Sequence, residues 1–176
     1  MLQYRKIDVN LEKDLQSLVK WYSDPEIRHL CHRHSDEQAY QAKVDPAYLA
    51  EKIRRKLKGQ YWLYMVTWGN EAIGEFSIEC GGSQLLKHHP KSALVGLIIG
   101  EAKFRGAGLG GQIMGEVETL VKSLGVRRIE LAAFKFNHPA IRLYQKLGYT
   151  EFQAEQNTTY WGGRMHSSIR LEKRLD

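Results

Sequence analysis

A glycine-rich turn between an apolar run and an amphipathic one is the segment of this sequence best suited to chemistry. The run from Leu94 to Ile99 is typical of a strand buried on both faces. Positions 106–111 follow it with four glycines, and a helical pattern begins at Gln112. Because glycine lacks Cβ, successive N–H groups can turn towards one anion, and a helix N-terminus adds unpaired N–H groups and the positive end of its dipole. The pattern predicts a phosphate-binding loop.

Two kinds of phosphate site are compatible with these glycines. Gly106-x-Gly108-x-x-Gly111 matches the dinucleotide-binding fingerprint, and Glu130 lies near the position where an acidic residue would meet a ribose. However, residues 101–105 separate the strand from the first glycine, and Glu130 sits inside the next apolar run rather than at its end. Dinucleotide binding is therefore the less favoured interpretation.

The second pattern is Arg105-x-x-Gly108-x-Gly110, which resembles the pyrophosphate loop of the GNAT superfamily of acetyl-CoA-dependent N-acetyltransferases. A downstream stretch, from Asn137 to Tyr149, is similar to the family's Asn-x-x-Ala…Tyr-x-Lys-x-Gly-Phe/Tyr segment. The two stretches come in the family's order, with a helical and a strand pattern between them. The resemblance covers roughly residues 60–155, and the joint occurrence is far more specific than either motif alone.

The resemblance implies an N-acetyltransferase that uses acetyl-CoA as cosubstrate and needs no metal. Backbone N–H groups of the loop would hold the phosphates, and backbone donors near the end of the 94–99 strand would bind the thioester oxygen. Asn137 would contact the pantetheine or cap the next helix. The positions expected at the coenzyme are Leu97, Ile98, Ile99, Arg105, Gly106, Ala107, Gly108, Leu109, Gly110, Asn137 and Tyr144.

Tyr144 also stands where the family keeps its general acid. A phenol with a reference pKa of about 10 stays protonated near neutral pH and can protonate a departing thiolate. The competing role for an aromatic residue on a short helix is packing in the core. We favour the catalytic role because the surrounding motif supports it.

The resemblance does not identify the general base. Many family members carry a carboxylate or histidine at the start of the central strand, where this sequence has Leu94 and Gly96. Among nearby glutamates we favour Glu79 as the second catalytic residue, over Glu75 on the same strand and Glu101 after the central strand. For each of these glutamates, a solvent-facing strand position is the favoured alternative to a catalytic role. A water relay, or an amine that arrives neutral, would also serve.

Apolar periodicity predicts the elements that position these groups. Strand patterns occupy residues 2–8, 61–68, 72–80, 94–99, 128–134, 149–156 and 165–171, and helical patterns occupy residues 10–22, 46–58, 108–124 and 139–147. Asn10 and Asp45 are the expected N-caps of the first two helices. The order predicts one α/β domain over residues 1–176, with a mixed sheet of about seven strands flanked by about four helices and one parallel β-α-β unit at its centre. In the GNAT fold that the order resembles, the strands at 94–99 and 128–134 splay apart around the pantetheine arm.

Composition limits the classes of binding partner and the compartment that we expect for this protein. The formal net charge of +6 favours an anionic partner such as coenzyme A. The densest basic stretch, Lys52 to Lys58, follows an amphipathic helical pattern, so we interpret it as a solvated face and expect no nucleic acid. We also expect no membrane segment and no signal peptide. Two cysteines without metal or redox spacing suit the cytoplasm.

Several features stay open at this point. The amine acceptor is a small molecule, such as a polyamine or aminoglycoside, or a protein N-terminus, and the sequence does not choose between them. The segment containing His29, His32 and His34 binds substrate, a metal or nothing. Homodimers are common in the family. The alternatives to an enzyme are an acyl-CoA-binding regulatory module and, less favoured, a dinucleotide-binding protein.

Overall fold

The computed structural model describes residues 1–175, and within this range seven strands join in one mixed sheet. The strands are β1 (Leu2–Lys6), β2 (Tyr61–Trp68), β3 (Glu71–Cys80), β4 (Ser92–Ile99), β5 (Arg128–Phe134), β6 (Thr150–Trp161) and β7 (Arg164–Arg174). Their order across the sheet is β1-β2-β3-β4-β5-β7-β6. Only the β4–β5 pair is parallel among these described strands. The predicted mixed sheet with one central parallel pair is confirmed.

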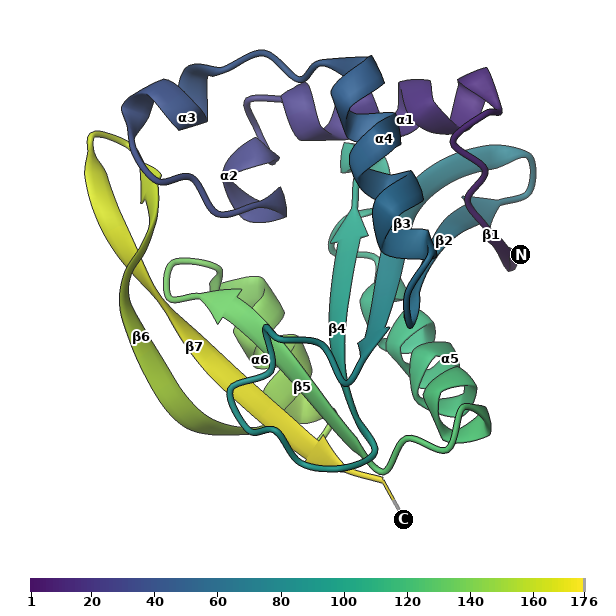
Figure 1. Cartoon of the computed structure of the whole chain (residues 1–176), viewed down its shortest axis with the longest axis vertical. Coiled ribbons are helices and arrows are strands. Elements are labelled where there is room, and N and C mark those ends of the chain that lie inside the picture. The colour runs from purple at the N-terminus through teal and green to yellow at the C-terminus, as the bar shows by residue number, and fades with distance from the viewer. Residues whose placement is uncertain (176) are drawn as a thin grey trace.

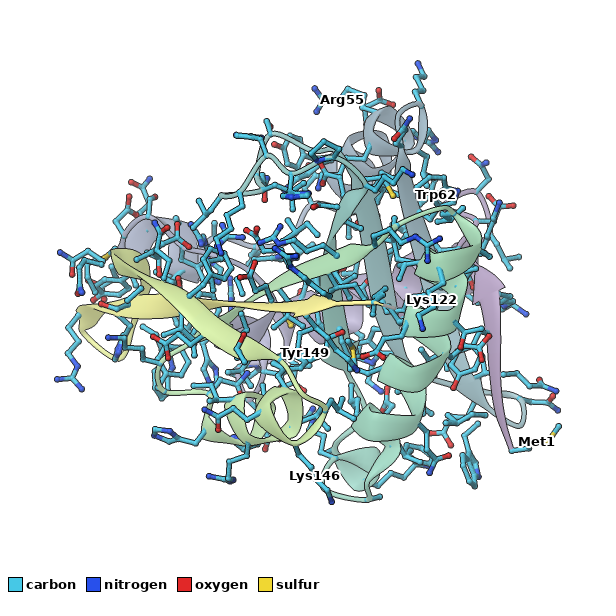
Figure 2. All side chains as sticks on the ribbon, turned by 90° about the horizontal axis from the view of Figure 1, so that it is seen from below. Met1, Arg55, Trp62, Lys122, Lys146 and Tyr149 are labelled. Carbon is cyan, nitrogen blue, oxygen red and sulfur yellow. The ribbon has the colours of Figure 1, made fainter. Side chains whose placement is uncertain are left out.

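Helices cover both faces of the sheet (Figure 1). They are α1 (Glu12–Ser23), α2 (Arg28–Cys31), α3 (Glu37–Gln41), α4 (Pro46–Leu57), α5 (Leu109–Ser123) and α6 (His138–Lys146). Leu18 of α1 and Ile53 of α4 pack with Met65 on one face, whereas Ile113 of α5 packs with Phe76 on the other. Figure 2 shows Arg55 of α4 and Lys146 of α6 on opposite sides of the sheet.

The parallel pair separates soon after it begins. Within the described chain, β4 and β5 pair only from Ser92–Arg128 to Leu94–Glu130. Beyond that point β4 stays paired with β3 as far as Ile99, and β5 stays paired with β7 as far as Phe134. The two strands diverge, as Figure 1 shows, so the expected splay is confirmed. One expectation needs correction: β4 is not buried along its whole length, because β5 no longer flanks residues 96–99, which are exposed or half-buried.

The four long predicted helices are present, and two short ones are added. The polar stretch that we expected to be irregular contains α2 and α3. Asp45 caps α4 by accepting hydrogen bonds from Ala47 N and Tyr48 N at 2.8 and 3.1 Å, as expected. The predicted cap at Asn10 is wrong. Asn10 instead donates its amide to Asp8 and accepts a hydrogen bond from Arg54, so Leu11 precedes α1 with no side-chain cap within the described chain.

A buried ionic network fills the sheet face where β5 meets β7. The fully buried Glu130 accepts hydrogen bonds from Arg128 at 2.8 Å and Arg170 at 3.4 Å, and from the backbone N–H groups of Leu86 and Lys87. Glu130 therefore ties the β3–β4 loop to the sheet. A carboxylate used in this way is not available to a ribose, which counts against the dinucleotide interpretation.

We expect Glu130→Ala to lower the free energy of unfolding by about 3 kcal/mol, because it leaves two buried guanidinium groups short of a counter-charge. Urea denaturation would measure the change. The exposed strand residue Glu151 provides the control, since Glu151→Gln should stay within about 0.5 kcal/mol of wild type. Equal effects from the two substitutions would contradict a structural role for the network.

Candidate active site

The glycine-rich turn forms an open backbone cradle at the start of α5. Gly106 and Gly108 both have a φ of +76°, a conformation that side chains with a Cβ rarely adopt. No described atom lies within 4 Å of a Cβ built on either residue, and within the described chain no side chain caps α5. The N–H group of Gly111 donates to the carbonyl oxygen of Gly108 at 3.3 Å, whereas those of Leu109 and Gly110 have no acceptor among residues 1–175 and can bind an anion. This arrangement suits the diphosphate of a coenzyme.

Arg105 anchors the loop to the sheet. Its guanidinium group donates hydrogen bonds to the carbonyl oxygens of Ile99 at 3.0 Å and Gly100 at 2.6 Å. These bonds satisfy two carbonyl groups at the end of β4 and engage the guanidinium group there. The sequence motif predicted an arginine beside the loop. In the structure, the guanidinium group of this arginine holds the loop against the end of β4.

The remaining loop residues differ in their surroundings. Ala107 is exposed, whereas Leu109 is buried in the core under the sheet. A Cβ on Gly110 would come within 2.8 Å of Leu143 Cδ2, so this glycine allows α5 to approach α6 closely. Gly110 thus serves helix packing, a role that the spacing of the motif does not reveal.

The diverging half of β4 carries the three residues expected near the thioester. Leu97 and Ile99 face the side covered by α5, and Ile98 faces the side covered by α1. Since β4 pairs with β5 only at residues 92–94 of the described chain, the β5-facing backbone edge of residues 95–99 is outside that ladder. Such an edge can donate hydrogen bonds to a bound carbonyl.

Tyr144 and Asn137 lie at α6, on the β5 side of the splay. Asn137 caps α6 by accepting a hydrogen bond from Ala140 N at 3.3 Å. Tyr144 is buried, and its ring centroid lies 5.9 Å from that of Tyr149. Burial raises the pKa of Tyr144 to about 12, so the phenol stays protonated at neutral pH. Its state fits a proton donor, and its burial also fits the packing role weighed above.

Glu79, the glutamate favoured from the sequence, is half-buried on β3. One carboxylate oxygen lies 3.5 Å from Lys56 Nζ. A Cβ on Gly82 would come within 2.3 Å of the other oxygen, so the loop after β3 closes over this side chain. The structure thus places Glu79 beside a cation and a loop. Among residues 1–175, no hydrogen bond joins Glu79 to Tyr144.

A buried pair that sequence reasoning did not recognise involves Glu75, four residues before Glu79 on the same face of β3. Tyr22 of α1 donates a hydrogen bond to Glu75 Oε1 at 2.5 Å, and both residues are buried. Glu75 was expected to face solvent. The correction follows from α1, which covers this face of β3. Burial raises the pKa of Glu75 to about 7, although the Tyr22 hydrogen bond and the charge of Lys56 act in the opposite direction.

Two contacts hold α1 over this face. A Cβ on Gly100 would come within 2.3 Å of the Trp21 ring, so the glycine permits the helix to meet the end of β4. Trp21 Nε1 then donates a hydrogen bond to Glu101 at 2.8 Å. These contacts fix the helical turn that carries Tyr22. The alternation of polar and apolar residues on β3 indicated which residues share a face, but not which helix covers it.

The segment containing α2 and α3 crosses from α1 to the β6–β7 hairpin (Figure 1). Its backbone joins the hairpin through His34, whose carbonyl oxygen accepts a hydrogen bond from Tyr160 N at 2.8 Å. Arg33 adds an ion pair with Glu155. The ring of His29 stacks on Trp161, with centroids 4.3 Å apart. This segment therefore bridges the two halves of the sheet beyond the splayed strands.

The three histidines of this segment make different contacts. His29 contacts aromatic rings, His34 contacts the hairpin, and the ring of His32 lies edge-on to Tyr22 at 4.3 Å. Among residues 1–175, no group of three or more His, Cys, Asp or Glu side chains is arranged to hold a metal ion.

Residues 15–149 match the acetyltransferase (GNAT) family. Among curated proteins, none matches the sequence significantly.

Solved structures share the fold at low sequence identity. An N-acetyltransferase from Staphylococcus aureus Mu50 is 15% identical, with a TM-score of 0.80 over 100% of this chain and 99% of that one. Spermidine N-acetyltransferase from Vibrio cholerae, in complex with CoA and spermine, is 16% identical, with a TM-score of 0.79 over 98% and 95%. Ribosomal-protein-alanine N-acetyltransferase from Brucella melitensis is 16% identical, with a TM-score of 0.78 over 98% and 99%.

The raised pKa of Glu75 predicts how its substitution changes stability with pH. The folded state binds the Glu75 proton more tightly than the unfolded state, so this contribution is complete below pH 4.5 and is lost as the pH rises through about 7. Glu75→Gln should therefore raise the free energy of unfolding at pH 8 by on the order of 3 kcal/mol, and change it little at pH 4. Urea denaturation at both pH values measures this. The exposed Glu71→Gln on the same strand is the control, and a pH-independent difference for Glu75→Gln would refute the assignment.

Proposed function

Because the chain belongs to the GNAT acetyltransferase family, we propose that it transfers the acetyl group of acetyl-CoA to a primary amine by direct attack in a ternary complex. The observation that carries the proposal is the divergence of β4 and β5 beside the uncapped N-terminus of α5. This combination offers an opening between two strands for a thioester and a cradle for its phosphates. The acceptor is a small-molecule amine or a protein N-terminus.

Acetyl-CoA would supply an activated acetyl thioester at this site. Backbone N–H groups from Gly106 to Gly110 would hold the diphosphate, and Arg105 would keep the loop against β4. The edge of β4 at Leu97 to Ile99 would donate hydrogen bonds to the acetyl oxygen as it gains charge. Asn137 would fix the start of α6, and with it Tyr144.

The balanced reaction forms a nitrogen–carbon bond, breaks the carbon–sulfur bond, and yields an N-acetylated amine, the CoA thiol and one proton. In our proposal Tyr144 gives its proton to the departing sulfur, since a buried phenol holds that proton at neutral pH. Glu79 stays the sequence-based prediction for the residue that receives a proton from the amine.

The acceptor side would be built from the segment that contains α2 and α3. Aromatic rings of His29, Phe136 and Trp161 gather there, with the Phe136 and Trp161 centroids 4.9 Å apart. Rings of this kind attract ammonium groups. The spermidine and ribosomal-protein-alanine acetyltransferases that share the fold act on different amines, so the fold is compatible with either class.

We also propose that the enzyme works in the cytoplasm as a single domain. The two free cysteines, Cys31 and Cys80, support a reducing compartment. No helix among residues 1–175 combines the length and apolar character needed to cross a bilayer.

The proposal is tested by thiol release from acetyl-CoA with polyamines, aminoglycosides, amino sugars and short peptides. At least one amine should release thiol at a rate well above that of water. Calorimetric binding of acetyl-CoA without any amine-dependent thiol release would favour an acyl-CoA-binding regulatory module. Binding of NAD in place of CoA would instead favour a dinucleotide-binding protein.

We expect Tyr144→Phe to lower kcat by about 10²–10⁴-fold with little change in the dissociation constant of acetyl-CoA, because only the transferable proton is removed. Stopped-flow thiol release and calorimetry measure the two quantities. Tyr149→Phe is a matched control: it deletes the hydroxyl that donates to Glu118 at 3.0 Å and should lower stability by about 1 kcal/mol with kcat preserved. An unchanged kcat in Tyr144→Phe would remove this residue from the mechanism.

We expect Gly108→Val to raise the KM for acetyl-CoA at least about tenfold, because a branched side chain would strain the loop and enter the open cradle. Gly125 lies at the other end of α5, has a φ of +77° against +76° for Gly108, and is equally open. Gly125→Val should therefore cost similar stability and leave the KM unchanged. Equal KM values for the two variants would contradict the phosphate-loop assignment.

A further inference from the structure

We propose that Glu75 is the residue that accepts the proton from the amine, and that Tyr22 is its positioning residue. The inference rests on the proposed acetyl transfer and adds to it a catalytic group that neither the motifs nor the fold assigns. Four observations support it: the place of Glu75 in the sheet, the hydrogen bonding of its two oxygens, the groups that surround it, and the contacts that the competing glutamates already make.

The register of the sheet brings Glu75 to the diverging part of β4. Glu75 pairs with Ile98, and Ser77 pairs with Gly96, so all four residues belong to the same sheet face. Gly96 is exposed, and so is Ala132 of β5, which lies on the same face two residues beyond the last β4–β5 pair. Two small, exposed residues therefore border the splay on this face. Glu75 lies diagonally adjacent to Gly96, a separation of about 7–8 Å between such positions.

The two oxygens of the Glu75 carboxylate differ. Oε1 accepts the hydrogen bond from the Tyr22 hydroxyl at 2.5 Å, which fixes the orientation of the carboxylate. Oε2 is buried and has no hydrogen-bond partner among residues 1–175. A buried, unpartnered carboxylate oxygen is costly for the fold, so its retention needs an explanation. Hydrogen bonding to an incoming ammonium group provides one.

Titratable groups from four elements interact electrostatically with Glu75. They are Tyr22 on α1, Cys31 on α2, Tyr61 on β2 and Lys56 on α4. Burial raises the pKa of Tyr22, of Tyr61 and of the Cys31 thiol, so these three groups stay neutral near pH 7. Lys56 supplies the positive charge, and its ammonium group lies 4.5 Å from the Tyr61 ring centroid. Glu75 is thus the acidic group of this cluster that changes charge near neutral pH.

The other two glutamates weighed from the sequence are already engaged. Glu79 lies beside Lys56 under the loop after β3. Glu101 accepts hydrogen bonds from Lys20 at 2.6 Å and Trp21 at 2.8 Å. Burial alone would raise the pKa of Glu101, but these two donors bring it below its ordinary value. A weakened base of this kind is poorly matched to an ammonium group, whereas a base that titrates near the working pH is well matched.

In the proposed reaction, Glu75 and Tyr144 each transfer one proton. The ammonium form of the acceptor gives one proton to Glu75 Oε2, directly or through one water, and the nitrogen lone pair then forms the bond to the acetyl carbon. The carbon–sulfur bond breaks, and Tyr144 protonates the sulfur. The second proton leaves the nitrogen after attack and restores Tyr144. Glu75 returns its proton to solvent past Tyr22, whose ring contacts the exposed His32.

The test is the pH dependence of kcat/KM for the most active amine of the panel, in wild type, Glu75→Gln and Tyr22→Phe. Wild-type activity should fall below an apparent pKa near 7. Glu75→Gln should lose about 10²–10⁴-fold and lack this acidic limb, while binding acetyl-CoA with wild-type affinity. The exposed Glu71→Gln on the same strand should match wild type in rate and profile.

Tyr22→Phe provides the readout that a purely structural role would not give. The Tyr22 hydrogen bond lowers the pKa of Glu75, so its loss should move the acidic limb to higher pH. This second variant also keeps the proposal testable if Glu75→Gln folds poorly. An unshifted limb in Tyr22→Phe would overturn the positioning role.

The outcomes separate this inference from the proposed function. If wild type acetylates an amine but Glu75→Gln retains its rate and acidic limb, Glu75 is not the base and acetyl transfer still stands. If Glu79→Gln alone removes the limb, the base is Glu79. If wild type releases no thiol with any amine of the panel, the proposed function fails and this inference fails with it.

Discussion

The loss of backbone pairing between β4 and β5 after Leu94 is the constraint on which the rest of the structure depends. Each strand keeps its outer neighbour, so β4 is held by β3 and β5 by β7. Backbone N–H and C=O groups at the diverging inner edges are thus left to be satisfied by something other than sheet. The elements on both sides of this divergence are held in place by specific contacts. Arg105 binds the end of β4, next to the N-terminus of α5, which no side chain caps among residues 1–175. Asn137 caps α6 on the β5 side.

The N-terminal segment turns that opening into a chemical environment. Gly100 and Trp21 bring α1 onto the end of β4, and this places Tyr22 over Glu75. A carboxylate in such a position is penalised when ionised, because burial removes its water and only one of its oxygens is hydrogen-bonded among the described residues. The same penalty makes it a base that responds near neutral pH. Stability is thus reduced at the point where reactivity is needed.

Sequence patterns predicted much of the framework because they depend on local rules. The Arg105-x-x-Gly108-x-Gly110 spacing and the Asn137 to Tyr149 stretch indicated the family, and the strand periodicities indicated the order of the elements along the chain. Patterns of this kind did not distinguish a glycine needed for its φ, such as Gly108, from one needed for helix contact, such as Gly110. They also misassigned the Asn10 cap, because Asp8 and Arg54 compete for that side chain.

By itself the sequence determined the mixed sheet, its parallel centre and the family, since each follows from the order of the elements or from short motifs, and it predicted a phosphate-binding loop. Only the tertiary structure decided the environments of the glutamates. Glu75, Glu79 and Glu130 all lie on strands and look equivalent in the sequence, yet one pairs with a tyrosine, one with a lysine and one with two arginines. The tyrosine lies 53 residues from Glu75 in the chain, and the lysine lies 23 residues from Glu79. The pKa of a carboxylate depends on such neighbours and on burial, and neither is a local property.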